Sequence, residues 1–164
     1  AFILALLGVV GFNAVYAKNY FTKIAPIDFM LGKEPRDRFI SRHDGSYPAV
    51  QYINRHTPAD AKIRLIFLAG RGYYLNRNYE DNVSFGSDII RNLALSSGDG
   101  EKFDKYLKSL NCTHFLMRYD LFQQFLKDNY SSEEINRLYG LLSKKVTLIF
   151  RDDYYAIFQL NDMS

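Results

Sequence analysis

Residues 62–77, KIRLIFLAGRGYYLNR, carry the pattern that decides the fold. Apolar residues run almost without interruption through residues 63–69, and only Arg64 breaks them. A run of this length indicates a strand that is covered on both faces, as in a parallel or mixed sheet. Gly-Arg-Gly at residues 70–72 ends that strand. Residues 73–75, Tyr-Tyr-Leu, predict a second short strand after a tight connection.

The loop at residues 70–77 is the first candidate for a ligand site, because loops at the carboxyl ends of strands in open α/β sheets are where ligands usually bind. The candidate ligand-binding residues are Arg71, Tyr73, Tyr74 and Arg77. Tyrosine rings stack on sugars, and arginines pair with phosphates. The loop is not a nucleotide fingerprint, because it has neither GxGxxG nor the Lys-Ser/Thr of a P-loop. The alternative is a plain connection between strands that binds nothing.

The composition is that of a globular protein rich in tyrosine. Of 164 residues, 48% are hydrophobic, 24% are charged and 13 are Tyr. Tyrosine in this quantity suggests partly wet surfaces, where the ring packs and the hydroxyl meets water. The formal net charge is only +3, and basic residues alternate with acidic ones along the chain. This balance argues against a nucleic-acid partner.

The sequence contains no motif for a metal or a cofactor. A single cysteine, Cys112, excludes an internal disulfide and a cysteine-based zinc site. Cys112 begins a predicted strand at residues 112–118, so we expect it to be a small buried residue. His114 in the same strand has no second ligand at metal-binding spacing, and we expect it to be packed and hydrogen-bonded. We therefore expect no metal and no cofactor.

Residues 1–17, AFILALLGVVGFNAVYA, are uncharged, and Asn13 is their one strongly polar residue. The run is slightly shorter than the ~20 apolar residues that span a bilayer. Because the chain begins without Met, we expect a longer parent protein whose preceding residues complete the span. Lys18 and Lys23 would then lie at the lipid headgroups. Residues 1–23 are thus expected to be the end of a transmembrane segment, with a buried helix of the soluble domain or a signal-peptide core as alternatives.

Residues 24–45 are expected to form a juxtamembrane connector and a charged helix. Pro35 suits the first turn of that helix, and Gly45 ends it. The helix carries the basic residues Arg36, Arg38 and Arg42. Together with Lys18 and Lys23, these are the candidate membrane-proximal residues, which would meet lipid phosphates or an anionic lipid-linked substrate. The alternative is a solvated helix with one apolar edge.

Residues 46–164 are expected to form a soluble α/β domain. Helical patterns occupy residues 46–56, 79–97 (with Ser84 as a cap), 101–110, 121–129 and 132–143. Residues 146–150 and 154–160 flank Asp152-Asp153 and predict an antiparallel hairpin. The order of elements predicts an α/β fold with a small mixed β-sheet and helices on its faces, preceded by an N-terminal hydrophobic helix.

Residues 47–77, YPAVQYINRHTPADAKIRLIFLAGRGYYLNR, resemble a segment that follows the last transmembrane helix in large bacterial membrane proteins. These proteins have the GT-C glycosyltransferase architecture and are related to protein O-mannosyltransferases and aminoarabinose transferases. The resembling elements are Tyr-Ile-Asn at 52–54, Thr-Pro-Ala-Asp-Ala-Lys at 57–62 and the loop at 70–77. LKSLNCTHFLM at 107–117 resembles a further element, in which Asn111 and Cys112 replace Gly and Ile.

The resemblance implies a function that the composition does not. Such enzymes transfer a sugar from a polyprenyl-phosphate carrier to an acceptor on the extracytoplasmic side, and their catalytic acids lie far upstream of this region. The resemblance therefore implies a non-catalytic C-terminal domain at the cell membrane, on its periplasmic or extracellular side. That domain would recognise the acceptor or glycan, or cover the active site. Implied partners are membrane lipid, through the N-terminal segment, and a lipid-linked sugar or glycan acceptor.

The alternative is a stand-alone soluble α/β domain that binds a nucleotide or another small ligand. In that case residues 1–17 would be an ordinary buried helix of the domain.

Overall fold

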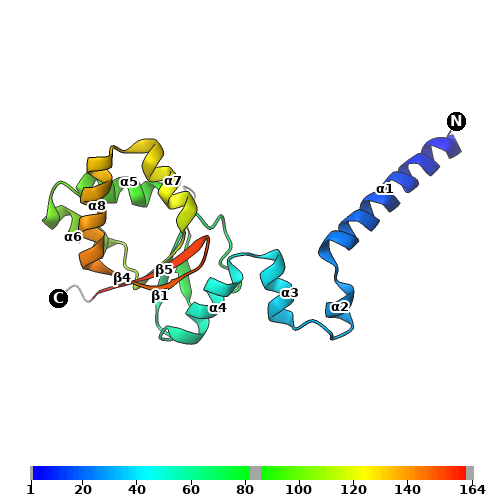
Figure 1. The fold of residues 1–164 in the computed structure, drawn as a ribbon, viewed down its shortest axis with the longest axis horizontal. Helices are drawn as coiled ribbons and strands as arrows, with labels where there is room; N and C mark the ends of the chain where they lie inside the picture. The colour runs from blue at the N-terminus through cyan, green and yellow to red at the C-terminus, as the bar shows by residue number, and fades with distance from the viewer. Residues whose placement is uncertain (1, 82–85, 162–164) are drawn as a thin grey trace. The chain divides into compact units, whose positions relative to one another are not determined.

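The structure is a computed structural model that describes residues 2–81 and 86–161. The chain divides into two compact units, Ala1–Gly45 and Ser46–Ser164. The described residues form eight helices and one five-stranded sheet (Figure 1). The predicted α/β class with a small mixed sheet is therefore confirmed. The Ser84 cap predicted from the sequence lies outside the described residues.

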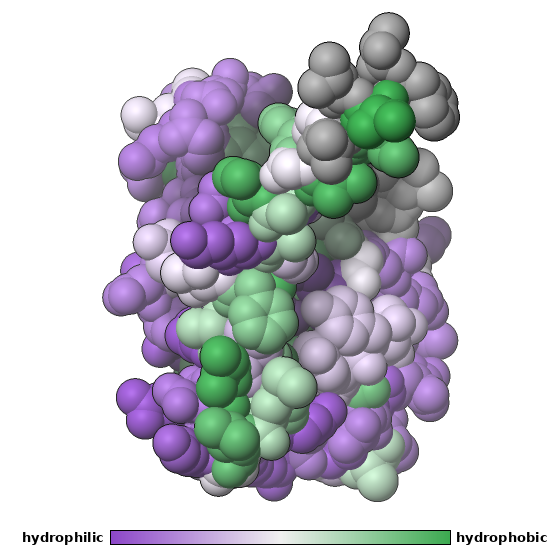
Figure 2. Space-filling view, turned by 90° about the vertical axis from the view of Figure 1, so that its right-hand side faces the viewer, coloured by the Kyte–Doolittle hydropathy of each residue, from purple (hydrophilic) through white to green (hydrophobic). Residues whose placement is uncertain are grey.

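The first unit consists of helices α1 (Phe2–Ile24), α2 (Ile27–Met30) and α3 (Arg36–His43). Apolar side chains are exposed along α1, among them Phe12 at 74%, and apolar surface of this unit is green in Figure 2. Within the described residues, no helix is both long and apolar enough to cross a membrane.

Helix α3 closes the carboxyl end of α1. Its Arg42 donates from Nη2 to the Ala25 carbonyl (3.3 Å), and its His43 Nε2 lies 3.1 Å from the Ile24 carbonyl. The rings of Phe29 and Phe39 stack with centroids 4.6 Å apart. Basic groups at a helix C-terminus satisfy its free carbonyls and interact favourably with the helix dipole.

The second unit is built on a sheet with strand order β2-β1-β3-β5-β4. β1 is parallel to both β2 and β3, whereas β5 is antiparallel to β3 and β4. The strands are β1 (Lys62–Ile66), β2 (Asn78–Glu80), β3 (His114–Arg118), β4 (Val146–Arg151) and β5 (Tyr155–Leu160). The predicted C-terminal hairpin is present as β4 and β5, and the ladder between them is interrupted by a bulge between Leu148 and Phe150.

Helices cover both faces of this sheet (Figure 1). One face, called here the α4 face, packs against α4 (Tyr47–His56) through Ile53, Ile63 and Leu116, all fully buried. The other face, called the four-helix face, packs against α5 (Ser87–Ser96), α6 (Gly100–Ser109), α7 (Tyr119–Asn129) and α8 (Ser132–Lys145). Alternate residues of a strand point to opposite faces, so β1, β3, β4 and β5 each contribute to the apolar clusters on both faces.

Helix starts on the four-helix face follow from local chemistry. Ser131 and Glu134 form a capping box at α8, in which each side chain bonds the other residue's backbone N–H. Asp99 caps α6 by accepting from the backbone N–H groups of Glu101 and Lys102. These bonds hold the pKa of the Asp99 and Glu134 carboxyls below their usual values.

The strand predictions around residues 62–77 were wrong in two places. β1 ends at Ile66 rather than at residue 69, because Phe67 and Ala69 have left-handed backbone angles (φ 60° and 51°) that a strand cannot contain. Residues 73–75 form turns, and the second strand is β2, which begins at Asn78. A Cβ at Gly72 would overlap the ring of Tyr79, so a larger residue there would require the exposed Tyr79 ring to move.

Candidate binding site at the carboxyl edge of the sheet

The connection from β1 to β2, residues 67–77 (the edge loop), is a series of turns and not a free loop. The Arg71 N–H donates to the Leu68 carbonyl (3.2 Å), and the Leu75 N–H donates to the Gly72 carbonyl (2.9 Å). The Gly70 N–H donates to Oδ2 of Asp81 (2.8 Å). The edge loop therefore satisfies much of its own backbone and holds its side chains in defined positions.

The side chain of Asn54 on α4 holds the edge loop through hydrogen bonds to the loop backbone. Its Nδ2 donates to the Tyr74 carbonyl, and its Oδ1 accepts from the Asn76 N–H, both at 2.8 Å. One side chain thus replaces a pair of backbone partners on either side of Leu75, which is buried against the α4 face. Sequence reasoning placed Asn54 in a resembling element without assigning it this role.

Arg77 serves the same purpose from the other end of the edge loop. Its Nη2 donates to the carbonyls of Asn54 (3.0 Å) and Thr57 (2.8 Å), at the carboxyl end of α4. Its Nη1 donates to the Asn76 carbonyl (3.0 Å). The structure therefore places this predicted ligand-binding residue in a half-buried, structural position, where it caps α4.

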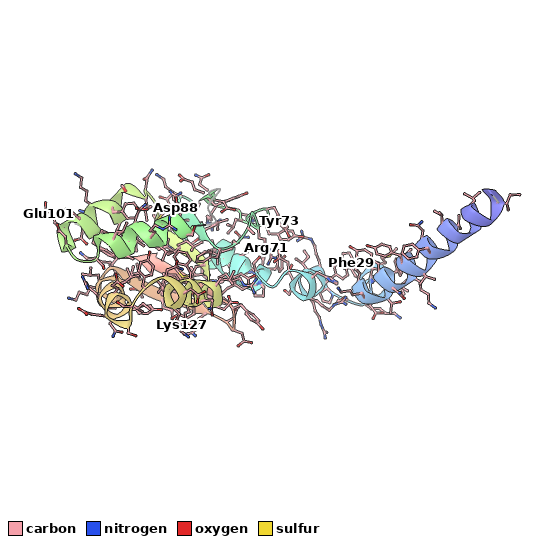
Figure 3. The ribbon with its side chains drawn as sticks, turned by 90° about the horizontal axis from the view of Figure 1, so that it is seen from above. Phe29, Arg71, Tyr73, Asp88, Glu101 and Lys127 are labelled. Carbon is pink, nitrogen blue, oxygen red and sulfur yellow. The ribbon has the colours of Figure 1, made fainter. Side chains whose placement is uncertain are left out.

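Of the other three predicted residues, Arg71 and Tyr73 are exposed, whereas Tyr74 is half-buried and packs against the α4 face. Tyr73 is 63% exposed, and its ring centroid is 4.4 Å from that of the half-buried Tyr74. Tyr74 in turn meets the ring of Tyr47 edge-on at 5.1 Å. The exposed Arg71 donates from Nη1 to the hydroxyl of Tyr155 (3.2 Å). Figure 3 shows Arg71 and Tyr73 close together on this loop.

Sequence reasoning missed the second half of the site, which comes from β3 and the β4–β5 turn. Arg118 ends β3 and is paired in register with Tyr155. Its Nε and Nη2 donate to the two carboxylate oxygens of Asp120 (3.1 and 3.2 Å), and this bonding raises the pKa of the Arg118 guanidinium. The guanidinium carbon is 5.9 Å from the ring centroid of Tyr154.

The sheet topology explains why these groups meet. β1 and β3 are parallel neighbours, so their carboxyl ends lie at the same edge, and antiparallel β5 begins there. The predicted hairpin identified the turn that holds Tyr154, but only the pairing of β5 with β3 places this turn at the carboxyl edge. Asp152, at that turn, accepts from the N–H groups of Tyr154 (2.9 Å) and Tyr155 (2.6 Å), so its carboxylate is used by the turn.

The resulting site, called the carboxyl-edge site, consists of Arg71, Tyr73, Arg118, Tyr154 and Tyr155. Arg118 forms an ion pair with Asp120, whereas Arg71 donates to the neutral hydroxyl of Tyr155, and no acidic side chain in the described part of the chain forms an ion pair with it. Tyr73 and Tyr154 are exposed rings beside those charges. Within residues 2–81 and 86–161, no cluster of three or more His, Cys, Asp or Glu side chains could hold a metal ion.

Cys112 and His114 lie away from this edge, at the start of β3. His114 is buried, as expected, and its Nδ1 lies 2.8 Å from the Thr113 hydroxyl. Burial lowers the pKa of His114. Cys112 precedes the strand rather than beginning it and is half-buried, and burial raises the pKa of its thiol to about 11. The Cys112 thiol therefore stays protonated at neutral pH and is not the thiolate that a nucleophile requires.

The predicted membrane-proximal residues belong to the first unit. Lys18 and Lys23 are exposed on α1, and Arg36 and Arg38 are exposed on α3. Arg42 differs from them, because it forms an ion pair with Glu34 (3.0 Å) in addition to its bond to Ala25. Its role in the structure is to hold α3 against the end of α1.

The second unit is an α/β domain with a polar, aromatic carboxyl edge. Comparison of the chain with models of known protein families and with curated proteins finds no match.

Proposed function

We propose that the second unit is a non-catalytic recognition domain, whose carboxyl-edge site binds a phosphorylated sugar or a glycan. The observation that carries the proposal is the position of Arg71: its Nη1 is 3.2 Å from the Tyr155 hydroxyl, beside the exposed ring of Tyr73, and no acidic side chain among residues 2–81 and 86–161 forms an ion pair with it. A guanidinium suits a phosphate or carboxylate oxygen pair, and flanking tyrosine rings suit the faces of a sugar. Asn54 and Arg77 fix the edge loop before any ligand arrives, which reduces the entropy lost on binding.

As a wider part of this proposal, the chain is the extracytoplasmic C-terminal end of a polyprenyl-phosphate-sugar-dependent membrane glycosyltransferase. The support is the resemblance of residues 47–77 and 107–117 to that family. In addition, the resembling Tyr-Ile-Asn element and the resembling loop are in direct contact, since Asn54 bonds the backbone of Tyr74 and Asn76. In such an enzyme the carboxyl-edge site would contact the acceptor or the glycan at the outer face of the membrane.

A titration of the full chain with a hexose 1-phosphate tests the binding proposal. We expect saturable binding that Arg71→Ala weakens by about tenfold or more, because a charge-assisted hydrogen bond is removed. Arg71→Lys should retain part of the affinity through its charge. The matched control is Arg137→Ala on α8, which removes an exposed arginine away from the site and should leave binding unchanged.

Two outcomes would contradict the proposal: no saturable binding, or equal binding by wild type and Arg71→Ala. Tighter binding of ATP than of the sugar phosphate, lost in Arg71→Ala, would favour the nucleotide-binding alternative. The wider assignment has its own test in the coding sequence upstream of Ala1. Several hydrophobic segments there would support a membrane glycosyltransferase, and an initiation codon directly before Ala1 would exclude it.

A further inference from the structure

The four-helix face contains a large apolar pocket that the proposed function does not use. Its volume is about 350 Å³, and it lies between the sheet and helices α5, α7 and α8. Met117 and Phe158 line it from the sheet, and Ile90 and Leu142 line it from the helices. Leu148, 49% exposed, and the exposed Ser143 are at its rim. The pocket therefore opens to solvent on one side.

Space of this size in a core is unfavourable when nothing fills it. Protein interiors pack as densely as organic crystals, and an unfilled cavity lowers stability in proportion to its volume. The α4 face of the same sheet consists of fully buried residues such as Ala49, Val50 and Ile53. Much of the pocket wall is also buried, as at Ile66 and Ile90, so the pocket is a shielded apolar space that is suited to a ligand.

One end of the pocket has tyrosine side chains, and an arginine that does not itself line the pocket lies next to this end. Tyr119 and Tyr139 line this end, and the Arg151 guanidinium lies 4.5 Å from the centroid of the Tyr119 ring. Among the described residues, no acidic side chain forms an ion pair with Arg151, so its charge is available. Burial raises the pKa of Tyr139 to about 12, so its hydroxyl stays protonated and can donate a hydrogen bond.

We propose that this pocket binds a single hydrocarbon chain of about a dozen carbons that ends in an anionic group. The length follows from the volume, because a ~150 Å³ apolar cavity holds one benzene ring. The single chain follows from the same volume, which is near the lower limit for ligand pockets. The anionic end follows from Arg151. This site is distinct from the carboxyl-edge site, and the proposal does not depend on the sugar-binding function.

Calorimetric titration of the full chain with monomeric dodecanoate tests the inference. We expect saturable binding that is tighter than for octanoate, since each buried methylene adds affinity. Leu142→Trp places a larger side chain in the pocket and should weaken binding by about tenfold. Its matched control is Leu95→Trp on α5, at a residue that is 74% exposed and outside the pocket, and binding should not change.

The anionic end is tested separately. Arg151→Gln should weaken dodecanoate binding by about fivefold, and Arg151→Lys should largely preserve it. Dodecanol, which has the same chain without the charge, should bind wild type and Arg151→Gln equally. Dodecyl phosphate distinguishes a phosphate head from a carboxylate head. Whichever of the two binds more tightly identifies the source of the natural ligand as a lipid phosphate or a fatty acid.

Absence of saturable binding would overturn the inference, as would equal affinities of wild type and Leu142→Trp. If Leu142→Trp fails to fold, Ser143→Phe at the exposed rim replaces it, and unchanged affinity in that variant would be equally contradictory. Equal binding of dodecanoate and dodecanol by wild type would overturn the role of Arg151.

Discussion

The two faces of the central sheet are both apolar, but they differ in what they contain: one holds the edge loop in place, and the other contains a pocket. The α4 face is closely packed, and Asn54 and Arg77 tie the edge loop to α4 through four hydrogen bonds at 2.8–3.0 Å. The four-helix face is larger, yet it leaves about 350 Å³ unfilled. The difference teaches that the hydrogen bonds which fix a loop lie on the face where that loop carries exposed side chains. Space is left on the face whose helices carry no such loop.

The largest expected effect is on the free energy of unfolding, when one buried isoleucine on each face is replaced by alanine. Ile53 on the α4 face is 0% exposed, and Ile90 on the four-helix face is 1% exposed. Ile53→Ala should lower the free energy of unfolding by about 4 kcal/mol, near the upper part of the range for such truncations. Ile90→Ala should cost about 2 kcal/mol, because part of its surface already faces the pocket.

Urea unfolding of the two variants measures the difference. Equal losses would mean that the two faces are packed alike, and the comparison would fail.

The second effect concerns the attachment of the edge loop to α4. Asn54→Ala leaves the Tyr74 carbonyl and the Asn76 N–H without their partner and should cost about 2 kcal/mol. Asn54→Asp is the matched control, because its carboxylate still accepts from Asn76 while the bond to Tyr74 is lost. We expect fast hydrogen exchange at the Asn76 amide in the alanine variant and slow exchange in the aspartate variant. Fast exchange in the wild type would show that the loop is not fixed by Asn54.

A third prediction concerns two substitutions, one on each face, that enlarge a side chain instead of shortening it. Val50→Leu inserts a methylene into the α4 face, where Val50 is 0% exposed, and should cost about 1–2 kcal/mol. Val146→Leu inserts the same group beside the pocket and should change stability by less than about 0.5 kcal/mol. Thermal unfolding of both variants measures the pair. A large loss in Val146→Leu would show that the pocket has no room for a methylene.

The smallest expected effect is a pH dependence of stability that arises from His114, which lies on the α4 face of β3 together with Leu116. Burial lowers the pKa of His114 below its ordinary value of 6.5, so the unfolded chain binds the proton more tightly. The contribution of neutral His114 to the free energy of unfolding is therefore complete above pH 6.5. It is lost as the pH falls through 6.5 towards the folded-state pKa. Unfolding curves between pH 5 and 8 should show a slope that His114→Gln reduces. An unchanged slope would assign the titration to other groups.

Sequence patterns predicted the elements better than their connections. The apolar run at residues 63–69 located β1, and the aromatic stretches around Asp152-Asp153 located the hairpin, because both depend on local chemistry. The end of β1 was not predictable, since Phe67 and Ala69 adopt left-handed backbone angles that are usual only for glycine and, less often, asparagine. Tertiary contacts override such preferences.

Only part of the candidate site could be predicted, because local patterns locate residues at the end of one strand but do not specify which strands are neighbours. Arg71 and Tyr73 follow a strand directly, so the rule for strand ends finds them. Arg118 and Tyr154 join them only because β3 lies beside β1 and β5 beside β3, which no local pattern specifies. Arg77 looks like a surface cation in the sequence, and only the carbonyls of Asn54 and Thr57, 20 or more residues earlier, show its structural role.

The bulge between Leu148 and Phe150 determines which face of the sheet carries a positive charge. Leu148 pairs with Phe158 on the four-helix face, and Phe150 pairs with Ile157 on the α4 face. The extra residue restores the alternation in favour of Arg151, which pairs with Ala156 and so returns to the four-helix face beside the pocket. If the same residues paired regularly, with no bulge, Arg151 would lie opposite Tyr155, on the α4 face. A single bulge in an edge strand thus decides that this cation lies on the same face of the sheet as the pocket.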